Sequence, residues 1–484
     1  MKSLQIKRKR QKFVSDSSRV ITKFYGPGGE ARMKRIIQRV LSLSDEECEA
    51  AVQNVLEDFS DRHLNLESDL LANYQETEYL VETAEELSRK RKLLLGAYFT
   101  QEYSIESAAL FNPSIVAHPD QTNLEEGSVR CILSFRAIGE GQISSIIFRS
   151  GVLDANCNFI MDCVRPFLKT PIVELNPTYD KKDFLTKLKE ARVYEDVCAR
   201  IFEKLPNRFL FNELQESIRE VAMAYPSSIA VRETIELIFW VARSDYEASF
   251  HHQTDLSERV IFPVARNESN GIEDARFVRF TDDDGDIRYY ATYTAFNGHT
   301  ILPMLLETRD FLRFRMRALS GKPVRDRGLT LFPRKINGKY MMISRYDGEN
   351  LYLMSSDDIH FWDSVQKLQT PTETWELIQI GNCGPPIETE AGWLLLTHGV
   401  GPLRKYCIGV QLLDLNDPSK IIGRSKTPLI MPNEYEREGY LPNVVYTCGA
   451  IVHNDKLVIP YAASDTTSGI AVIGLNPLLE RLLQ

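Results

Sequence analysis

The sequence predicts a mainly β protein, a five-bladed β-propeller that carries an N-terminal helical region and a helical insertion. Three observations lead to this prediction: apolar strands follow Gly- or Asp-containing turns, these turns recur at a similar spacing, and two blocks keep a helical period. A chain of 484 residues is long enough for several domains. We expect an N-terminal helical region at residues 1–100, a first part of the propeller at 101–180, a helical insertion at 181–245 and the remainder of the propeller at 246–484.

Both helical blocks show apolar residues at helical spacing. In the first block, Ser44 and Glu47 form the pattern of a capping box at the start of a helix. A further helix is expected from about residue 78 to residue 95, with Gly96 as its stop. In the second block, apolar residues between positions 211 and 222 lie on one helical face. Since β-like sequence flanks this second block on both sides, we interpret it as an insertion.

Five apolar strands, each with a turn residue before it, form the repeat of the β part. The turn residues are Gly127, Gly285, Gly338, Gly392 and Asp455. The last four are separated by 53, 54 and 63 residues, and the first gap is longer because the helical insertion falls inside it. Hairpins at this spacing are typical of propeller blades. A β-sandwich with similar hairpins is the alternative.

Composition and charge argue against several classes of partner. The chain has 58 Lys and Arg against 67 Asp and Glu, a formal net charge of −9, which is unfavourable for a general nucleic-acid binder. The basic start at Lys7–Arg10 is interpreted as a solvated tail. No apolar run approaches the ~18 residues of a membrane helix. Eight scattered cysteines without a CxxC pair favour reduced thiols in the cytoplasm, and no metal site is expected.

Polar side chains stand at the ends of the apolar strands. Arg136, Arg345 and His398 end three of them, and Asp465 lies just beyond another. A buried charge is costly unless it is paired or hydrogen-bonded. Since these residues recur at equivalent positions, we expect them to meet in one pocket at the propeller axis. The alternative for each is an ordinary surface or ion-pairing residue.

The adjacent carboxylates Glu273 and Asp274 precede Arg276 and are candidates for acid chemistry. Burial and a neighbouring like charge both raise the pKa of a carboxyl group, which suits a general acid. A charged turn that pairs with Arg276 and Arg279 is the alternative.

The segment from Arg325 to Lys335 concentrates cationic groups in an acidic protein. Fixed guanidinium groups can hold a phosphate or a carboxylate through two hydrogen bonds. A solvated basic edge is the alternative, and it suits Arg334 and Lys335 better than Arg345, which ends an apolar strand.

Taken in order, these segments resemble glycoside hydrolase family 130, the β-mannoside phosphorylases and related mannosidases. The resemblance covers roughly residues 110–175 and 247–471. The motifs that carry it are Phe111–Ser114, Gly271–Arg276, Leu331–Lys335 with Arg345, Gly384–Thr389 with His398–Val400, Tyr435–Gly439 with Pro442–Val445, and Tyr461–Asp465. The family is a five-bladed propeller, in agreement with the five hairpins.

The resemblance implies inverting phosphorolysis of short β-manno-oligosaccharides to α-mannose 1-phosphate, with inorganic phosphate as co-substrate and no cofactor. Asp274 would be the general acid, acting through a hydroxyl of the mannosyl ring. The residues at the phosphate-binding positions are Arg327, Arg345, His398 and Gln379, and those at the sugar-binding positions are Asn112, Arg136, Glu273 and Asp465.

Two positions depart from the family pattern. Ala275 stands where the family usually has proline, and Gln379 stands where phosphorylases commonly have lysine. The loss of that ammonium group keeps hydrolysis by a β-mannosidase open, with water as the nucleophile. Mannosyl transfer in the synthetic direction and a non-catalytic carbohydrate-binding propeller are further alternatives. The helical additions are candidates for a homo-oligomer interface or for a cap over the pocket.

Overall fold

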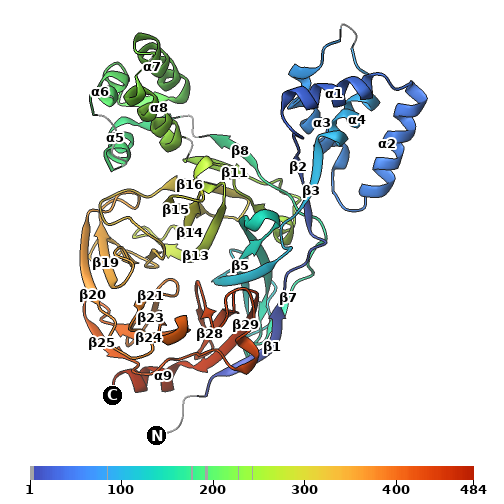
Figure 1. The fold of residues 1–484 in the computed structure, drawn as a ribbon. Coiled ribbons are helices and arrows are strands. Elements are labelled where there is room, and N and C mark those ends of the chain that lie inside the picture. The colour runs from blue at the N-terminus through green and yellow to red at the C-terminus, as the bar shows by residue number, and fades with distance from the viewer. Residues whose placement is uncertain (1–4, 84–85, 176–177, 191–194, 227, 243) are drawn as a thin grey trace.

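The computed structural model of the chain describes residues 5–83, 86–175, 178–190, 195–226, 228–242 and 244–484. The protein is mainly β, which confirms this part of the expected fold class. Its long strands form five groups that lie in a ring, and two clusters of helices stand outside the ring at the top of the view (Figure 1).

The first two strand groups are continuous with one another. The first contains β4 (Ala109–Ala117), β5 (Val129–Ile138), β6 (Ser144–Leu153), β7 (Phe159–Met161) and β12 (Val260–Ile261). The second contains β13 (Gly271–Thr281), β14 (Ile287–Phe296), β15 (Ile301–Thr308), β16 (Arg313–Ala318), β11 (Tyr246–Ser249) and β8 (Ile172–Leu175). A parallel pairing of Gly271 with Ser144 joins them into one eleven-stranded sheet.

The other three groups are separate antiparallel sheets. The third contains β17 (Thr330–Leu331), β18 (Tyr340–Ser344), β19 (Leu351–Ser356) and β20 (Ser364–Gln369). The fourth contains β21 (Gln379–Asn382), β22 (Ile387–Thr389), β23 (Gly392–Val400), β24 (Tyr406–Leu413) and β25 (Ile421–Arg424). The fifth contains β26 (Val445–Tyr446), β27 (Ile451–His453), β28 (Lys456–Ala463), β29 (Thr467–Gly474) and β1 (Lys7–Phe13).

The five expected apolar strands are all present, one in each group. They are β5, β14, β18, β23 and β28. Each pairs with a strand that precedes it and with one that follows it in the chain. The turn spacing in the sequence therefore reported a real structural repeat.

The basic start of the chain is a strand, so the interpretation as a solvated tail is wrong. β1 pairs antiparallel with β29, the last strand, and Lys7 lies opposite Val472. The guanidinium group of Arg8 donates to both carboxylate oxygens of Glu436, at 2.9 and 3.0 Å. Residues 1–100 thus begin with a strand of the C-terminal group, and the helices of this region start at Glu30.

The N-terminal helices form a compact cluster on a two-stranded stem. They are α1 (Glu30–Leu41), α2 (Asp45–Phe59), α3 (Leu66–Gln75) and α4 (Arg89–Tyr98), and the stem pairs β2 (Val20–Phe24) with β3 (Thr100–Ser104). Ser44 and Glu47 form the expected capping box. The expected helix over 78–95 is wrong in both limits: α4 starts after Ser88 and continues through Gly96.

Gly96 lies inside α4 because another backbone approaches it. A Cβ atom at this position would come within 1.9 Å of the carbonyl oxygen of Leu70 in α3. The glycine therefore permits close helix packing and does not end the helix.

The second helical cluster occupies the segment interpreted as an insertion. It consists of α5 (Lys181–Glu190), α6 (Glu195–Glu203), α7 (Phe211–Ala224) and α8 (Ile229–Ala242), with the antiparallel strand pair β9 (Thr178–Asp180) and β10 (Arg208–Leu210). Its buried side chains form one apolar cluster, and those of α1–α4 form another. A last helix, α9 (Leu475–Leu482), packs on the fourth and fifth groups.

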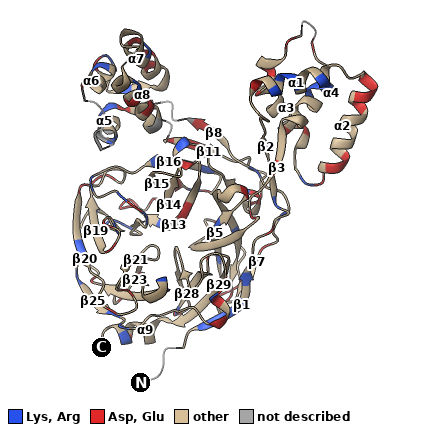
Figure 2. Cartoon of the chain, in the orientation of Figure 1, with Lys and Arg blue, Asp and Glu red and all other residues tan. Residues whose placement is uncertain are grey.

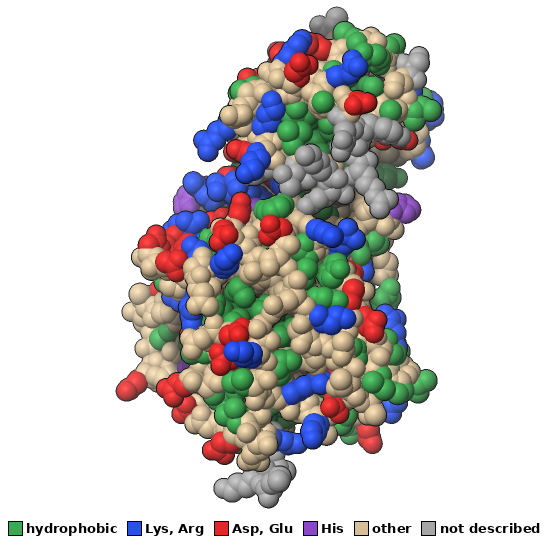
Figure 3. Space-filling model, turned by 90° about the vertical axis from the view of Figure 1, so that its left-hand side faces the viewer, with side chains coloured by type: hydrophobic (Ala, Val, Ile, Leu, Met, Phe, Trp, Pro, Cys, Tyr) green, Lys and Arg blue, Asp and Glu red, His purple; other side chains and the backbone are tan. Residues whose placement is uncertain are grey.

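Charged side chains of both signs are distributed over the molecule. Acidic residues gather along α2, and basic residues mark β1 (Figure 2). On the face seen in Figure 3, acidic and basic side chains alternate over the β part and do not form a patch of one sign. Among the described residues, no helix combines the length and the apolar character needed to cross a membrane.

Candidate active site

Residues from all five strand groups line one cavity of about 150 Å³. A cavity of this volume can hold one six-membered ring. The lining residues are Asn112, Arg136, Asp274, Arg276, Arg327, Gly328, Arg345, Gly381, Asn382, His398, Tyr406, Leu441, Val444, Tyr446 and Asp465. Seven of the nine site residues expected from the sequence are among them, so the structure brings the polar strand ends together as predicted.

Glu273 and Gln379 are the two expected site residues outside this lining. Gln379 begins β21 and lies two residues before Gly381, so both are on the same face of the strand. On this face of β21, Gln379 is therefore the neighbour of Gly381, which lines the cavity. Glu273 is buried behind the cavity wall, with 6% of its surface exposed.

Two β-bulges aim Asn112 and Asp274 into the cavity. The register of β4 shifts between Phe111 and Ser114, and that of β13 shifts between Glu273 and Arg276, with one extra residue on the inner strand in each case. Asn112 and Asp274 have φ angles of 49° and 55°, in the left-handed region that Asn and Asp tolerate better than most residues. Such backbone strain commonly occurs where a side chain is placed for function.

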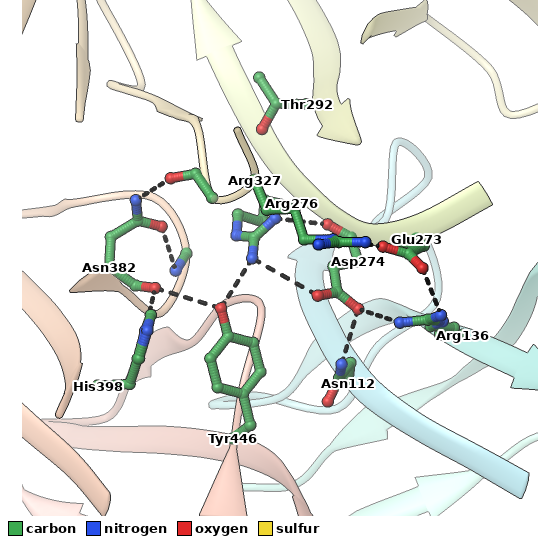
Figure 4. A network of polar contacts seen from close by, with 12 residues as sticks. Asn112, Arg136, Glu273, Asp274, Arg276, Thr292, Arg327, Asn382, His398 and Tyr446 are labelled. Carbon is green, nitrogen blue, oxygen red and sulfur yellow. Dashed lines mark hydrogen bonds and ion pairs between the residues drawn. The ribbon is translucent and has the colours of Figure 1, made fainter. Parts of the chain in front are cut away.

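The carboxylate of Asp274 is surrounded by donors (Figure 4). Asn112 Nδ2 donates to Oδ1 at 2.7 Å, Arg136 Nη1 lies 3.4 Å from the same oxygen, and Arg276 Nη2 lies 3.9 Å from Oδ2. Burial alone would raise the pKa of Asp274, but the charges of Arg136, Arg276 and Arg327 and the bond from Asn112 outweigh it, and the pKa is lowered. In the free pocket this carboxyl group is therefore ionised at neutral pH, in contrast to the raised pKa expected from the sequence.

Glu273 connects two arginines of the cavity wall. Its Oε1 accepts from Arg136 Nη2 and its Oε2 accepts from Arg327 Nε, both at 2.8 Å. Arg136 lies over the ring of Phe111 and Arg327 lies over that of Phe296, at 5.3 and 5.5 Å from the ring centres. With both oxygens engaged, Glu273 positions the two guanidinium groups.

The cavity wall is rich in arginine. Four arginines and two aspartates line it, and Glu273 and Asp326, outside the lining, pair with three of these arginines. Arg345 follows β18 directly, and its Nη2 lies 3.3 Å from Asp326 Oδ2, on the loop that carries Arg327. Guanidinium groups gathered in one pocket can hold an anion through several hydrogen bonds.

His398 is held by a backbone carbonyl group. Its Nδ1 lies 3.0 Å from the carbonyl oxygen of Asn382, and 4% of the residue is exposed. Burial, and next the charge of Arg345, lower its pKa to about 3, although the bond to Asn382 opposes this shift. The ring is thus neutral at neutral pH, and the arginines alone supply the positive charge.

Asp465 is the second carboxyl group of the cavity. It lies in the turn between β28 and β29 with a φ angle of 50°. Burial raises its pKa to about 6, the neighbouring charge of Asp274 adds to this rise, and Arg136 and Arg404 oppose it. The pKa values of the two carboxyl groups in this cavity are therefore shifted in opposite directions.

Three lining residues that connect the network were not expected from the sequence: Arg276, Asn382 and Tyr446. Arg276 Nη2 donates to the hydroxyl of Tyr446 at 2.8 Å, and that hydroxyl lies 3.4 Å from the carbonyl oxygen of Asn382 (Figure 4). The side chain of Asn382 donates to the carbonyl oxygen of Gly328, next to Arg327. The sequence signal was weak, since Asn382 and Tyr446 carry no charge and stand in short strands.

Comparison with known proteins places this site in a family. The model of glycoside hydrolase family 130, described as β-1,4-mannooligosaccharide phosphorylase, matches residues 213–483, more than half of the chain. The chain belongs to glycoside hydrolase family 130. This membership confirms the resemblance found in the sequence. The family 130 match includes the lining residues from Asp274 onward, whereas Asn112 and Arg136 precede it.

Several relatives of this family 130 protein are phosphorylases by name. The 1,2-β-oligomannan phosphorylase of Thermoanaerobacter sp. (strain X514) is 35% identical over 226 residues, which are 45% of this chain and 74% of that protein. The β-1,2-mannobiose phosphorylase of Listeria innocua serovar 6a is 26% identical over 371 residues, which are 74% of this chain and 97% of that protein. The β-1,4-mannooligosaccharide phosphorylase of Ruminococcus albus is 28% identical over 240 residues, which are 46% of this chain and 70% of that protein.

Proposed function

We propose that this family 130 protein phosphorolyses short β-mannosides and releases α-mannose 1-phosphate. One observation carries the proposal: a single cavity joins the carboxyl group of Asp274 to the guanidinium groups of Arg327 and Arg345 and the ring of His398. The relatives named as β-1,2- and β-1,4-mannoside phosphorylases support this class of substrate and inorganic phosphate as the second reactant.

In the proposed reaction, Asp274 protonates the glycosidic oxygen and a phosphate oxygen attacks the anomeric carbon from the opposite face. The bond from that carbon to the glycosidic oxygen breaks as the bond to phosphate forms, so the configuration inverts. The proton passes through a hydroxyl of the mannosyl ring. No second carboxylate is needed to activate the nucleophile, because phosphate is already an anion.

Phosphate itself would prepare Asp274 for its role. The lowered pKa of Asp274 in the free pocket depends on the charges of nearby arginines. A bound dianion offsets these charges and adds a like charge beside the carboxylate, and both effects raise the pKa of Asp274. The acid would therefore gain its proton only when the nucleophile is present, which disfavours hydrolysis.

The phosphate position is assigned to the arginines and His398. Four arginines line the cavity, so guanidinium groups are available to hold a phosphate dianion without a lysine at position 379. Gln379, at the edge of the cavity, would act as a neutral donor to the anion or to the sugar. Fixed guanidinium groups around the attacking oxyanion supply orientation and charge stabilisation.

The sugar position is assigned to Asn112, Arg136 and Asp465. The Oδ1 atom of Asn112 is buried, and no described residue donates a hydrogen bond to it. A hydroxyl group of the substrate would satisfy this acceptor, which would otherwise cost free energy. We assign Glu273 to the same subsite indirectly, as the group that holds Arg136.

We also propose that the five strand groups are the blades of a five-bladed propeller. Each group contains one of the five apolar hairpin strands, and all five contribute to one cavity. The pairing of β1 with β29 joins the start of the chain to the last group, a common way to close such a ring. The helical clusters have their own apolar cores and remain candidates for a homo-oligomer interface.

A cytoplasmic location is part of the proposal. All eight cysteines lie in the described part of the chain, and no disulfide forms between them there. Thiols persist in this state in a reducing compartment. The reaction as proposed needs phosphate and a mannoside but no cofactor.

The decisive experiment incubates the protein with β-1,2-mannobiose or β-1,4-mannobiose, with and without phosphate. We expect mannose 1-phosphate only when phosphate is present, with the α configuration in its NMR spectrum. Asp274→Asn should lower the rate at least 100-fold, since a positioned acid contributes about 10²–10⁴-fold. Asp61→Asn, which changes an exposed aspartate in the N-terminal region, is the matched control.

Two results would contradict the proposal. Free mannose as the product, whether or not phosphate is present, would identify a hydrolase. An unchanged rate in Asp274→Asn would remove the proposed acid.

A further inference from the structure

The protonation of His398 follows from its hydrogen bond. Its Nδ1 lies 3.0 Å from the carbonyl oxygen of Asn382, and a carbonyl oxygen can only accept. Nδ1 therefore carries a hydrogen atom. The same carbonyl oxygen lies 3.4 Å from the hydroxyl of Tyr446, so its position is fixed from two sides.

The ring of His398 is confined in this orientation. It stacks on Tyr406 with ring centres 5.9 Å apart and meets the edge of Tyr446 at 5.0 Å. Gly381 on the neighbouring strand β21 allows its approach, because a Cβ atom there would lie 2.3 Å from Cε1 of the ring. Rotation of the ring by half a turn would place a carbon atom against the Asn382 carbonyl and lose the hydrogen bond.

The charged groups around His398 keep the ring neutral. Arg345 after β18 and Arg276 on β13 both disfavour a positive charge on it, and only Asp274 on β13 favours one. A neutral imidazole with a hydrogen atom on Nδ1 has a lone pair on Nε2. His398 lines the cavity and is the one histidine among the lining residues of the described chain.

We propose that Nε2 of His398 accepts a hydrogen bond from a hydroxyl group of the bound oxyanion, so that the site selects monohydrogen phosphate over sulfate. This inference rests on the proposed function and specifies the form of its anionic reactant. The arginines attract any dianion of this size, whereas a lone pair on Nε2 discriminates between dianions. It bonds to an anion that carries a hydroxyl group and repels one that presents only unprotonated oxygens.

The test compares four tetrahedral dianions by calorimetric titration of the full chain at neutral pH. Phosphate and arsenate each carry a hydroxyl group, whereas sulfate and selenate carry none. We expect the first pair to bind at least about tenfold more tightly than the second, the usual effect of one hydrogen bond to a charged group. Equal binding of phosphate and sulfate would overturn the inference.

A variant tests whether His398 causes the preference for phosphate over sulfate. His398→Asn keeps an amide near Nδ1 and removes the acceptor at the Nε2 position. It should weaken phosphate and arsenate about tenfold and change sulfate less than twofold. His299→Asn, in the exposed turn between β14 and β15, is the matched control and should change neither. Equal weakening of phosphate and sulfate in His398→Asn would contradict the inference.

A measurement on the unaltered protein covers the case in which His398→Asn does not fold. Nitrogen NMR of the histidine side chains distinguishes a hydrogen atom on Nδ1 from one on Nε2. We expect the Nδ1 form for His398, and the Nε2 form would overturn the inference.

The outcomes separate this inference from the proposed function. Phosphorolysis with equal affinity for sulfate and phosphate would contradict the inference alone. Absence of phosphorolysis with every mannoside would contradict the function. If His398→Asn raised the KM of the mannoside and left phosphate affinity unchanged, His398 would contact the sugar and the inference would be wrong.

Discussion

Asp274 and Asp465 line the same cavity, but their surroundings differ. Asp274 lies beside three arginines and accepts a hydrogen bond from Asn112, whereas no described residue donates a hydrogen bond to Asp465. Burial dominates at Asp465 and raises its pKa to about 6, and the charge of Asp274 adds to this rise. Opposite pKa shifts in two neighbouring carboxyl groups are typical of sites that divide acid and binding roles between them.

The raised pKa of Asp465 predicts that its ionised carboxylate lowers the free energy of unfolding at neutral pH. The pKa rises from 3.8 to about 6 on folding, so the folded state loses stability as the pH increases from about 4 through 6. Asp465→Asn cannot ionise and should increase the free energy of unfolding by about 1–3 kcal/mol at neutral pH. The gain should vanish below about pH 4. Urea unfolding at several pH values measures this difference, and a gain that is independent of pH would contradict the assignment.

A substitution at Glu273 should weaken the binding of both substrates. It holds Arg136 on the sugar side and Arg327 on the phosphate side, so Glu273→Gln should raise the KM of both mannoside and phosphate, each about tenfold. Initial rates with both reactants varied measure the two constants. Glu307→Gln, which alters a carboxylate paired with Arg288 outside the cavity, is the control. A rise in only one KM would show that Glu273 serves a single subsite.

For individual residues, the sequence predicted which side chains enter the pocket better than it predicted which side chains contact one another. Arg136, Arg345 and His398 were expected in one pocket because they end apolar strands, and the cavity contains all three. The pairing of Glu273 with two arginines was not expected, because it depends on the distance between β13, β5 and the loop before β17. The neutral state of His398 likewise depends on charges that come from other strands.

Among the elements, β1 departs most from the sequence-based expectation. Its Lys- and Arg-rich sequence has no apolar alternation, and only Phe13 at its end is fully buried. It forms a strand because β29 offers an unpaired edge, and because Glu436 accepts two hydrogen bonds from Arg8. Glu436 also accepts from the hydroxyl of Tyr461. Tertiary pairing thus overrides local sequence here.

Arg8 should contribute measurably to stability through this pairing. Arg8→Ala leaves the partly buried carboxylate of Glu436 without its bidentate partner, and we expect a loss of about 1 kcal/mol in the free energy of unfolding. Arg10→Ala changes an exposed arginine on the same strand and should have little effect. Equal effects of the two substitutions in thermal unfolding would mean that β1 is held by its backbone alone.

The bulges in β4 and β13 could not be located from sequence. Phe111–Ser114 and Gly271–Arg276 were recognised as motifs, but an extra residue in a strand becomes visible only when the partner strand fixes the register. Asn112 and Asp274 are residue types that tolerate a positive φ angle, and this was the available signal. The turn residues before the five apolar strands were a clearer signal, because hairpin turns are local.

The whole molecule combines a β part with two helical clusters that have separate apolar cores. The sequence predicted both helical blocks because helical periodicity is a property of neighbouring residues. No residue of α1–α4 or α5–α8 lines the cavity, and the place of each cluster beside the strands could not be predicted, because it depends on contacts between distant segments.

Phosphate should stabilise the β part selectively. A ligand at 100 times its Kd adds about 2.7 kcal/mol to the free energy of unfolding of the unit that binds it. The cavity is built from the strand groups, so phosphate should slow hydrogen exchange there and leave the amides of α1–α4 and α5–α8 unchanged. Equal protection of all three units would show that they unfold together.

The contact between β1 and β29 has a consequence for synthesis on the ribosome. Translation makes Lys7–Phe13 hundreds of residues before its partner Thr467–Gly474. The β1 segment must therefore stay without its partner until β29 has been made, and the turn that carries Asp465 emerges directly before β29. A nascent chain that lacks this turn also lacks one of the two carboxyl groups of the cavity, so the pocket is complete only after most of the strands have been made.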